Sequence, residues 1–322
     1  MSKPAIIWLI VAAALVVISL ILFAVTMFMN EWDFTRINTR KYELNEHSIS
    51  DSFTNIAIHT DTANIQLVLS DDGSCRVVCH EISKAKHHVS VDDGTLTVRM
   101  SDERKWYDHI GIGWGESKIT VYLPETAYSS LSIQESTGKV DIPCDFTFES
   151  MGIRTSTGDV KNAASVLGEA KIQTSTGDIS VEGISVGSLS LTVTTGHVTV
   201  SDVNCQGNIT VNVSTGRTEL SNVSCSDLSS DGSTGDIILK DVIASGKYSL
   251  ERSTGDIKFE GCDASEIWVQ TDTGSITGSF LSDKIFFAQS DTGRVNVPKT
   301  LSGGKCEITT DTGNIKITVN ES

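Results

Sequence analysis

The chain has 322 residues, enough for one large domain or two ordinary ones. Its 25 basic and 41 acidic residues give a formal net charge of −16, which argues against nucleic acid or an anionic membrane surface as a direct partner. With 39% hydrophobic residues and only 4 prolines, the composition is typical of a folded chain rather than a disordered one.

The chain begins with an apolar segment that is long enough to cross a membrane. The 25 residues from Ala5 to Met29 carry no charge, and about 20 helical residues already span the hydrocarbon core. The segment is too long for the apolar region of a cleaved signal peptide, and no small-x-small cleavage site follows it. We therefore predict an uncleaved single-pass anchor over residues 1–30, followed by a linker over residues 31–41.

The charges around this span favour an extracytoplasmic location for the bulk of the chain. Lys3 and the α-amino group precede the span, and Glu31 and Asp33 follow it. This asymmetry predicts that the N-terminus lies inside and the rest of the chain lies outside the cytoplasmic membrane. Three basic residues between positions 36 and 41 weaken the rule, so a domain that faces the cytosol remains the alternative.

Residues 42–124 read as irregular β-structure with turns at Asp71–Gly73 and Asp93–Gly94. Predicted strands cover Phe53–Ile58, Ile65–Leu69, Cys75–Cys79, Leu96–Met100 and Ile119–Leu123. We interpret this segment as a cap on the repeats that follow, although an independent small domain is also compatible with it.

The chain contains seven cysteines, and none of them has the paired spacing of a zinc site, so we predict buried free thiols. Cys75 and Cys79 lie roughly 13 Å apart along one strand and cannot bond each other.

Two other features of this segment bear on possible sites. Lys105–Gly115 is a glycine-rich loop in which Trp106, Tyr107 and Trp114 could contact a partner or the membrane, or cover the protein's own core. The adjacent pair His87-His88 makes a poor metal site, because neighbouring side chains of a strand point to opposite faces.

A short motif of the form [S/T/D]-T-G-x-[V/I] recurs through the rest of the chain. STGDI, for example, occurs at Ser175, Ser233 and Ser253, and one copy, STGRT, ends in threonine. Successive motif glycines are 19 or 20 residues apart, which is a specific signal of a repeat architecture. The ten glycines are at positions 138, 158, 177, 196, 216, 235, 255, 274, 293 and 313.

The pattern around each glycine predicts strands. Apolar residues recur at positions −7 and −5 and again at +2 and +4, and this alternation of period 2 shifts phase across the glycine. The glycine should therefore lie at a corner. We predict an all-β fold: a single-stranded parallel β-solenoid of about ten coils over residues 125–322, preceded by one transmembrane helix. An antiparallel sandwich or prism is the alternative.

The repeats, the strand KITVYLP at Lys118–Pro124 and the loop KWYDHIGIGWG at Lys105–Gly115 resemble a bacterial putative-adhesin family of β-strand-repeat proteins. The family is related to auto-transporter adhesin head domains, and the resemblance covers roughly residues 42–320. It implies a surface-exposed, membrane-tethered β-repeat domain linked to envelope sensing. It carries no catalytic residues that could be transferred to this chain.

The last repeats supply the candidate binding residues. Their motifs begin with Asp272, Asp291 and Asp311, and each forms an Asp-Thr-Gly triplet like that of the aspartic proteases. The other copies of the motif have Ser or Thr at this position, so the aspartates are explained by the repeat. These carboxylates should stack on neighbouring coils as solvated acidic surface or as a Ca²⁺ site. An outward aromatic pair on successive coils, flanked by two amides, could bind glycan or protein. These four residues are Trp268, Phe287, Gln270 and Gln289.

These observations lead to a non-enzymatic hypothesis without a cofactor. We expect an adhesion, scaffold or envelope-sensing module in the cytoplasmic membrane, held by residues 5–29. Its expected partners are a cell-surface glycan or another envelope protein, and its open ends could self-associate. The alternatives are a membrane-bound regulator that faces the cytosol and a β-helix enzyme acting on polysaccharides.

Overall fold

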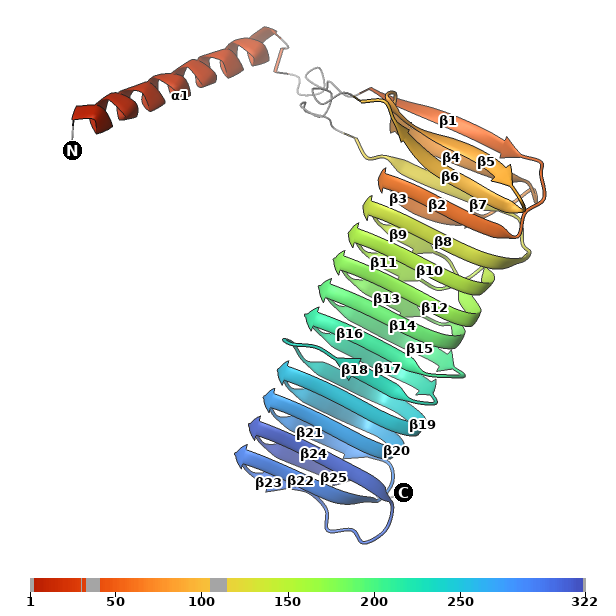
Figure 1. Cartoon of the computed structure of the whole chain (residues 1–322), viewed down its shortest axis with the longest axis vertical. Coiled ribbons are helices and arrows are strands. Elements are labelled where there is room, and N and C mark those ends of the chain that lie inside the picture. Colours follow the sequence, from red (N-terminus) through yellow and green to blue (C-terminus); the bar gives the residue numbers. More distant parts are fainter. Residues whose placement is uncertain (1–2, 30, 33–40, 105–114, 321–322) are drawn as a thin grey trace.

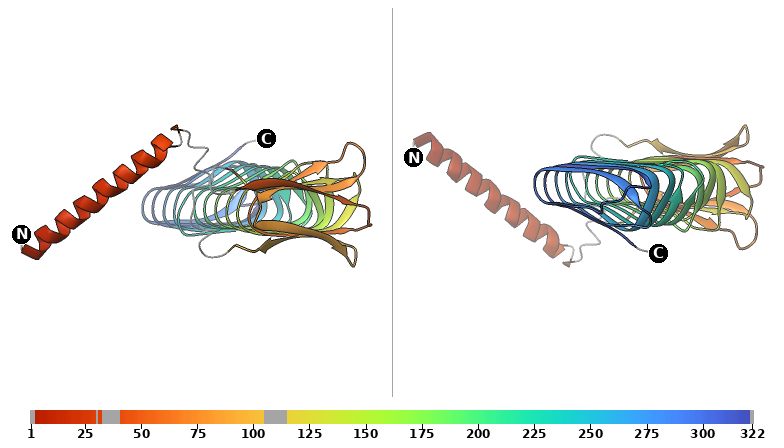
Figure 2. Two further views of the ribbon diagram at one scale, coloured as in Figure 1. Left: turned by 90° about the horizontal axis from the view of Figure 1, so that it is seen from above. Right: turned by 90° about the horizontal axis from the view of Figure 1, so that it is seen from below.

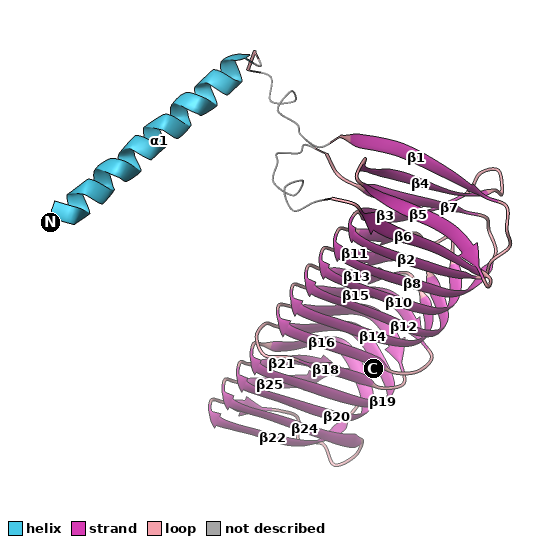
Figure 3. Cartoon of the chain, turned by 45° about the horizontal axis from the view of Figure 1, so that its top comes forward, coloured by secondary structure: helices cyan, strands magenta, loops and turns pink. Residues whose placement is uncertain are grey.

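The computed structural model describes residues 3–29, 31–32, 41–104 and 115–320 and confirms a parallel β-solenoid of about ten turns (Figure 1). Among these residues, one helix, α1 (Lys3–Met29), precedes the solenoid, and 25 strands follow it (Figure 3). Within α1, the predicted segment Ala5–Met29 is long and apolar enough to cross a membrane. The strands that follow α1 in the chain form one end of the stack, and the last coils form the opposite end.

Each repeat forms one coil with a long strand, a glycine corner, a shorter strand and a second bend, so that the coils are elongated in cross-section (Figure 2). The predicted apolar positions point inward on both sides of the corner, as Ile153 and Val160 do, while the residues between them face solvent. Because every coil places its inward residues in the same register, they form one continuous core from Ile56 to Ile317.

The strands stack in two walls, which we name after their longer and shorter strands. The long-strand wall contains β8 (Ala127–Thr137), β10 (Thr147–Thr157), β12 (Ser165–Thr176), β14 (Ser185–Thr195), β16 (Ile209–Thr215), β18 (Leu228–Asp231), β24 (Gly304–Thr312) and β22 (Lys284–Thr292). The short-strand wall contains β9 (Val140–Ile142), β11 (Val160–Asn162), β13 (Ile179–Glu182), β15 (Val198–Cys205), β17 (Thr218–Cys225), β21 (Ile276–Phe280), β25 (Ile315–Val319) and β23 (Val295–Asn296). Two long strands, β19 (Ile237–Thr254) and β20 (Ile257–Thr273), run through both walls.

The motif glycines form the first corner because successive corners touch through their backbones. Gly216 has a φ of 141°, and a Cβ atom there would lie 1.8 Å from the carbonyl oxygen of Gly196. Its N–H donates to the carbonyl of Thr234 in the next coil. Only glycine combines this backbone conformation with so close an approach.

Polar side chains beside the corner tie one coil to the next. The aspartate that follows the glycine accepts a hydrogen bond from a backbone N–H of the next coil, as Asp178 Oδ1 does from His197 N at 2.7 Å. Inside the corner, Thr271 Oγ1 donates to the carbonyl of Gly255 in the preceding coil at 3.1 Å. The aspartates of the STGD motif thus satisfy backbone donors that the bend leaves free.

The second bend uses residues that tolerate a left-handed backbone. Gly183, Asp202, Asn222, Asp241 and Gly261 occupy it with φ between 52° and 68°. Asn222 Nδ2 also donates to Asp202 Oδ1 of the preceding coil at 2.6 Å. This explains why Asn, Asp and Gly recur in the looser turn of each repeat.

The N-terminal end departs from the repeat. In the first coil, Ala63 occupies the corner between its two strands, and Gly138 lies over its carbonyl. This coil pairs on one side with β8 and β9 and on the other with β6 and β7, and antiparallel strands lie beyond those. The strands of this end are β1 (Tyr42–Ile49), β2 (Asn55–Thr62), β3 (Asn64–Leu69), β4 (Cys75–Ile82), β5 (Ala85–Asp92), β6 (Thr95–Asp102) and β7 (Lys118–Leu123).

At the C-terminal end, the last two repeats stack in reverse order of sequence. Strand β20 pairs with β24, and β24 pairs with β22, so the repeat of β24 and β25 is inserted before that of β22 and β23. Ile308 and Ile315 of the inserted repeat are fully buried, whereas Phe286 and Ala288 of the terminal repeat are only partly covered. The more aliphatic repeat thus has neighbours on both sides. Self-association through the open edge stays a prediction.

The glycine corner predicts that Gly216→Ala destabilises the solenoid by about 3 kcal/mol or more, because the added Cβ meets a backbone carbonyl at a positive φ. Gly152→Ala is the matched control, since nothing lies within 4 Å of a Cβ there. Thermal unfolding of the full chain in detergent should show Tm lowered by roughly 5 °C or more for Gly216→Ala and nearly unchanged for Gly152→Ala. Equal Tm values for the two variants would contradict the packing argument.

Candidate functional site

The structure assembles most of the predicted binding residues on the outer surface of the last three coils. Outward positions of β20, β24 and β22 lie side by side in register. We call these nine residues the distal platform, in rows that run across the three strands: Trp268, Glu307 and Phe287; Gln270, Thr309 and Gln289; and Asp272, Asp311 and Asp291.

The aromatic pair was expected on successive coils, and this expectation was wrong. Because β24 is inserted between β20 and β22, Glu307 lies between Trp268 and Phe287. The two rings are therefore attached to strands roughly 10 Å apart, twice the spacing of neighbouring strands. Lys305 Nζ lies 2.7 Å from Glu307 Oε2 and 5.8 Å from the centroid of the Phe287 ring. The platform thus presents two aromatic side chains on either side of a charged pair.

The three aspartates of the platform do stack on neighbouring coils, but with Asp311 in the middle. The register places it opposite both Asp272 and Asp291, and all three are exposed. Gln289 Nε2 donates to Asp291 Oδ1 at 3.3 Å. Calcium binding at these carboxylates stays a prediction.

The predicted contact loop lies outside the described residues. Trp106, Tyr107 and Trp114 belong to residues 105–114, whose arrangement the structure does not describe. Their role as a partner or membrane contact therefore stays a prediction.

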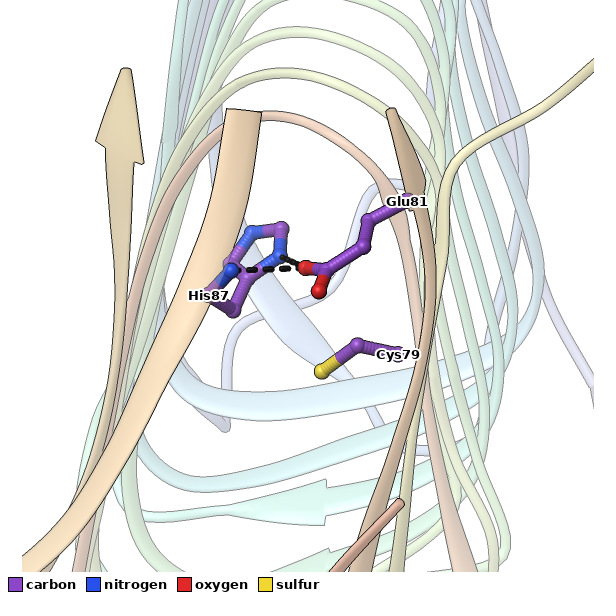
Figure 4. A group of neighbouring side chains, drawn as sticks. All are labelled: Cys79, Glu81 and His87. Atoms are coloured by element: carbon purple, nitrogen blue, oxygen red, sulfur yellow. Dashed lines mark hydrogen bonds and ion pairs between the residues drawn. The ribbon is translucent and has the colours of Figure 1, made fainter. Parts of the chain in front are cut away.

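A second cluster lies inside the N-terminal end of the solenoid, where Cys79, Glu81 and His87 converge (Figure 4). Strands β4 and β5 are joined by a two-residue turn, with Ile82 paired to Ala85. Beyond that pair, β4 joins β7 and β5 joins β6. The two strands therefore face each other across the interior, and their inward side chains meet there. All three side chains of the cluster are buried.

The carboxylate and the imidazole of this cluster are held by further hydrogen bonds. Glu81 Oε2 accepts from both the backbone N–H and Nδ1 of His87 at 2.6 Å, and Glu81 Oε1 accepts from Asn45 Nδ2 at 2.7 Å. On the other side of the ring, His87 Nε2 lies 2.9 Å from Thr60 Oγ1. The side chains of Glu81 and His87 are 1% and 2% exposed, so the pair is almost completely buried.

The order of hydroxyl, imidazole and carboxylate is that of an activated nucleophile. Thr60, however, is only 8% exposed, and the side chains of Glu81 and His87 are almost completely buried. The bonds therefore serve to fix the orientation of His87. Burial, together with the charge of Glu81, raises the pKa of the Cys79 thiol to about 12, so the free thiol is protonated at neutral pH.

A further carboxyl group lies in the same interior. Glu135 of β8 is paired with Thr60 in the sheet and is 7% exposed, and neither of its carboxylate oxygens has a hydrogen-bond partner among the described residues. Burial raises its pKa to about 7, despite the opposing effect of the nearby Thr155 hydroxyl. The polar interior thus extends from Glu81 to Glu135.

Sequence reasoning did not find this cluster. The prediction that His87 and His88 point to opposite faces is confirmed, since His87 is buried and His88 is exposed. The available signal was the spacing of Cys79 and Glu81 at i and i+2, which places both on one face of β4. The meeting with His87 required knowing that β4 and β5 separate into opposite walls.

The fold and the repeats define a parallel β-solenoid protein with one N-terminal apolar helix. The chain belongs to the Toastrack DUF4097 family, whose model matches residues 53–212 and 204–322. This agrees with the resemblance that the repeats indicated. No curated protein matches the chain.

Several solved structures are similar to the chain. A putative lipid-binding protein from Parabacteroides distasonis aligns with a TM-score of 0.51 at 17% identity, over 75% of this chain and 98% of that one. A putative adhesin from the same species aligns with a TM-score of 0.48 at 12% identity, over 85% and 98% of the two chains. A putative adhesin from Parabacteroides merdae aligns with a TM-score of 0.47 at 12% identity, over 87% and 98%. The first of these similarities shows a shared fold.

The raised pKa of Glu135 predicts that the stability of the folded chain decreases as the pH rises. Because the pKa of Glu135 is higher in the folded chain than in the unfolded one, the folded state holds the extra proton, and stability falls as pH rises from about 5 to about 7. Glu135→Gln should match the wild type near pH 5 and exceed it by about 1–3 kcal/mol at pH 8. The free energy of unfolding, measured for the variant and the wild type across this pH range, tests the prediction. Glu149→Gln is the control because Glu149 is exposed, and we expect no gain over the wild type as the pH rises.

Proposed function

We propose that the chain is a membrane-anchored, extracytoplasmic and non-enzymatic binding module, which presents the distal platform to a cell-surface glycan. The observation that carries the proposal is the position of the platform, on the last three coils of a rigid stack whose other end is joined to α1 (Figure 1). A solenoid attached at one end holds such a surface away from the membrane.

The chemistry of the platform suits a sugar chain. The exposed ring of Phe287 and the partly exposed ring of Trp268 offer apolar faces to the C–H groups of a pyranose. Gln270, Thr309 and Gln289 form a row of donors and acceptors between the aromatic and acidic rows, and sugar hydroxyls need such partners. An extended row of subsites fits a linear glycan better than a compact ligand.

The non-enzymatic part of the proposal rests on the interior cluster. The hydroxyl–imidazole–carboxylate arrangement of Thr60, His87 and Glu81 lies inside the solenoid rather than on an accessible surface. The carboxylates of the platform lie on its open outer face, with one aspartate per coil, where solvent surrounds them.

Glycan binding should depend on the aromatic side chains. The double variant Trp268→Ala/Phe287→Ala of the full chain in detergent should lose at least about tenfold in affinity for isolated cell-wall glycan, because each ring contributes about 1 kcal/mol of stacking. Leu167→Ala, which removes an even more exposed apolar side chain from the middle of the stack, is the control and should bind normally. Unchanged binding by the double variant would refute the platform, and binding only to envelope proteins would redirect the proposal to a protein ligand.

The orientation can be tested on the native chain. Among the described residues, Cys144 is the exposed cysteine and the other six are buried. A membrane-impermeant maleimide should therefore label the wild-type protein in intact cells and leave Cys144→Ser unlabelled. Labelling that occurs only after lysis would place the solenoid in the cytosol and favour the regulator instead.

A further inference from the structure

We propose that Cys79, Glu81 and His87 bind one Zn²⁺ ion inside the N-terminal end of the solenoid. Their Sγ, carboxylate oxygen and imidazole nitrogen atoms all lie within 4.8 Å of one another, and all three residues are buried (Figure 4). Thiolate, imidazole and carboxylate are the donor types that zinc takes in proteins.

The charges of the site balance when the ion is bound. Zinc would displace the Cys79 thiol proton to solvent and bind Glu81 as the carboxylate and His87 as the neutral imidazole. The resulting complex, with two positive and two negative charges, is neutral, and neutrality lowers the free-energy cost of burying the ion. The ion would replace the 2.6 Å contact between Glu81 Oε2 and His87 Nδ1.

Two of the three ligands, His87 and Glu81, already have hydrogen-bond partners that would orient them for the metal. With Nδ1 bound to the metal, the imidazole proton resides on Nε2 and is donated to Thr60 Oγ1, which lies 2.9 Å away. Asn45 Nδ2 holds the second oxygen of Glu81 at 2.7 Å. Outer hydrogen bonds of this kind fix the orientation of metal ligands. The Cys79 sulfur has no hydrogen-bond partner among the described residues, whereas the sulfur of Cys262 lies within hydrogen-bond distance of two carbonyl oxygens.

The geometry needs only small movements. Bond lengths of about 2.0–2.3 Å in a tetrahedral site place ligand atoms roughly 3.3–3.7 Å apart, so side-chain shifts of about 1 Å suffice. His87 also lines a cavity of about 550 Å³, together with Tyr42, Ile82 and Ala85. A water molecule from this cavity would supply the fourth ligand.

Cobalt titration of the full-length chain in detergent tests the site. Co²⁺ should bind one ion per chain and produce a thiolate-to-cobalt charge-transfer band, which added Zn²⁺ should abolish. Cys79→Ser should remove the band. Cys75→Ser should keep it, because Cys75 is a buried cysteine of the same strand that lies outside the cluster.

A second readout covers the case in which Cys79→Ser fails to fold. Zn²⁺ should raise the Tm of the wild type through linkage, and Glu81→Gln, which keeps the shape of the side chain, should weaken metal binding at least about tenfold. The proposal is overturned if Co²⁺ does not bind, if it binds without the charge-transfer band, or if Cys79→Ser retains the band. These results would leave Glu81 and His87 as a structural hydrogen-bonded pair, and they do not bear on glycan binding by the platform.

Discussion

The backbone contact between successive glycine corners is the constraint on which the rest of the structure depends. At each corner the space that a Cβ would occupy is filled by the carbonyl of the preceding corner, as at Gly158 over Gly138. This contact brings the coils to strand-pairing distance, so the strands on both sides of the corner align in register. The register then places apolar side chains above one another and produces the continuous core.

The two ends of the stack depart from the repeat in opposite ways. The N-terminal end is enclosed by antiparallel strands and holds a buried polar interior around Glu81, His87 and Glu135. The C-terminal end is open, and its terminal strand β22 leaves Phe287 more than half exposed. Buried polar groups and exposed aromatic groups are both costly in a repeat protein. Their concentration at the ends is why we place the candidate sites there.

The two candidate sites differ in physical character. The distal platform is a solvated surface whose affinity would come from many weak contacts along the rows of Trp268, Gln270 and Asp272. The interior cluster is a closed, low-dielectric site in which one ion could be bound strongly by Cys79, Glu81 and His87. A metal there would link β4 to β5 and hold together the end of the solenoid that follows α1 in the chain.

The sequence alone determined the local rules of this protein. The 19–20-residue glycine spacing, the alternation of apolar residues and the phase shift at the corner predicted the solenoid, and the uncharged run Ala5–Met29 predicted the apolar helix. These features are periodic or contiguous, so they can be read from neighbouring residues. Tertiary structure alone decided that Glu307 separates Trp268 from Phe287 and that His87 meets Cys79. Both depend on which strands become neighbours at the ends of the stack, and these pairings join residues that are far apart in the chain or depart from the order of the repeats.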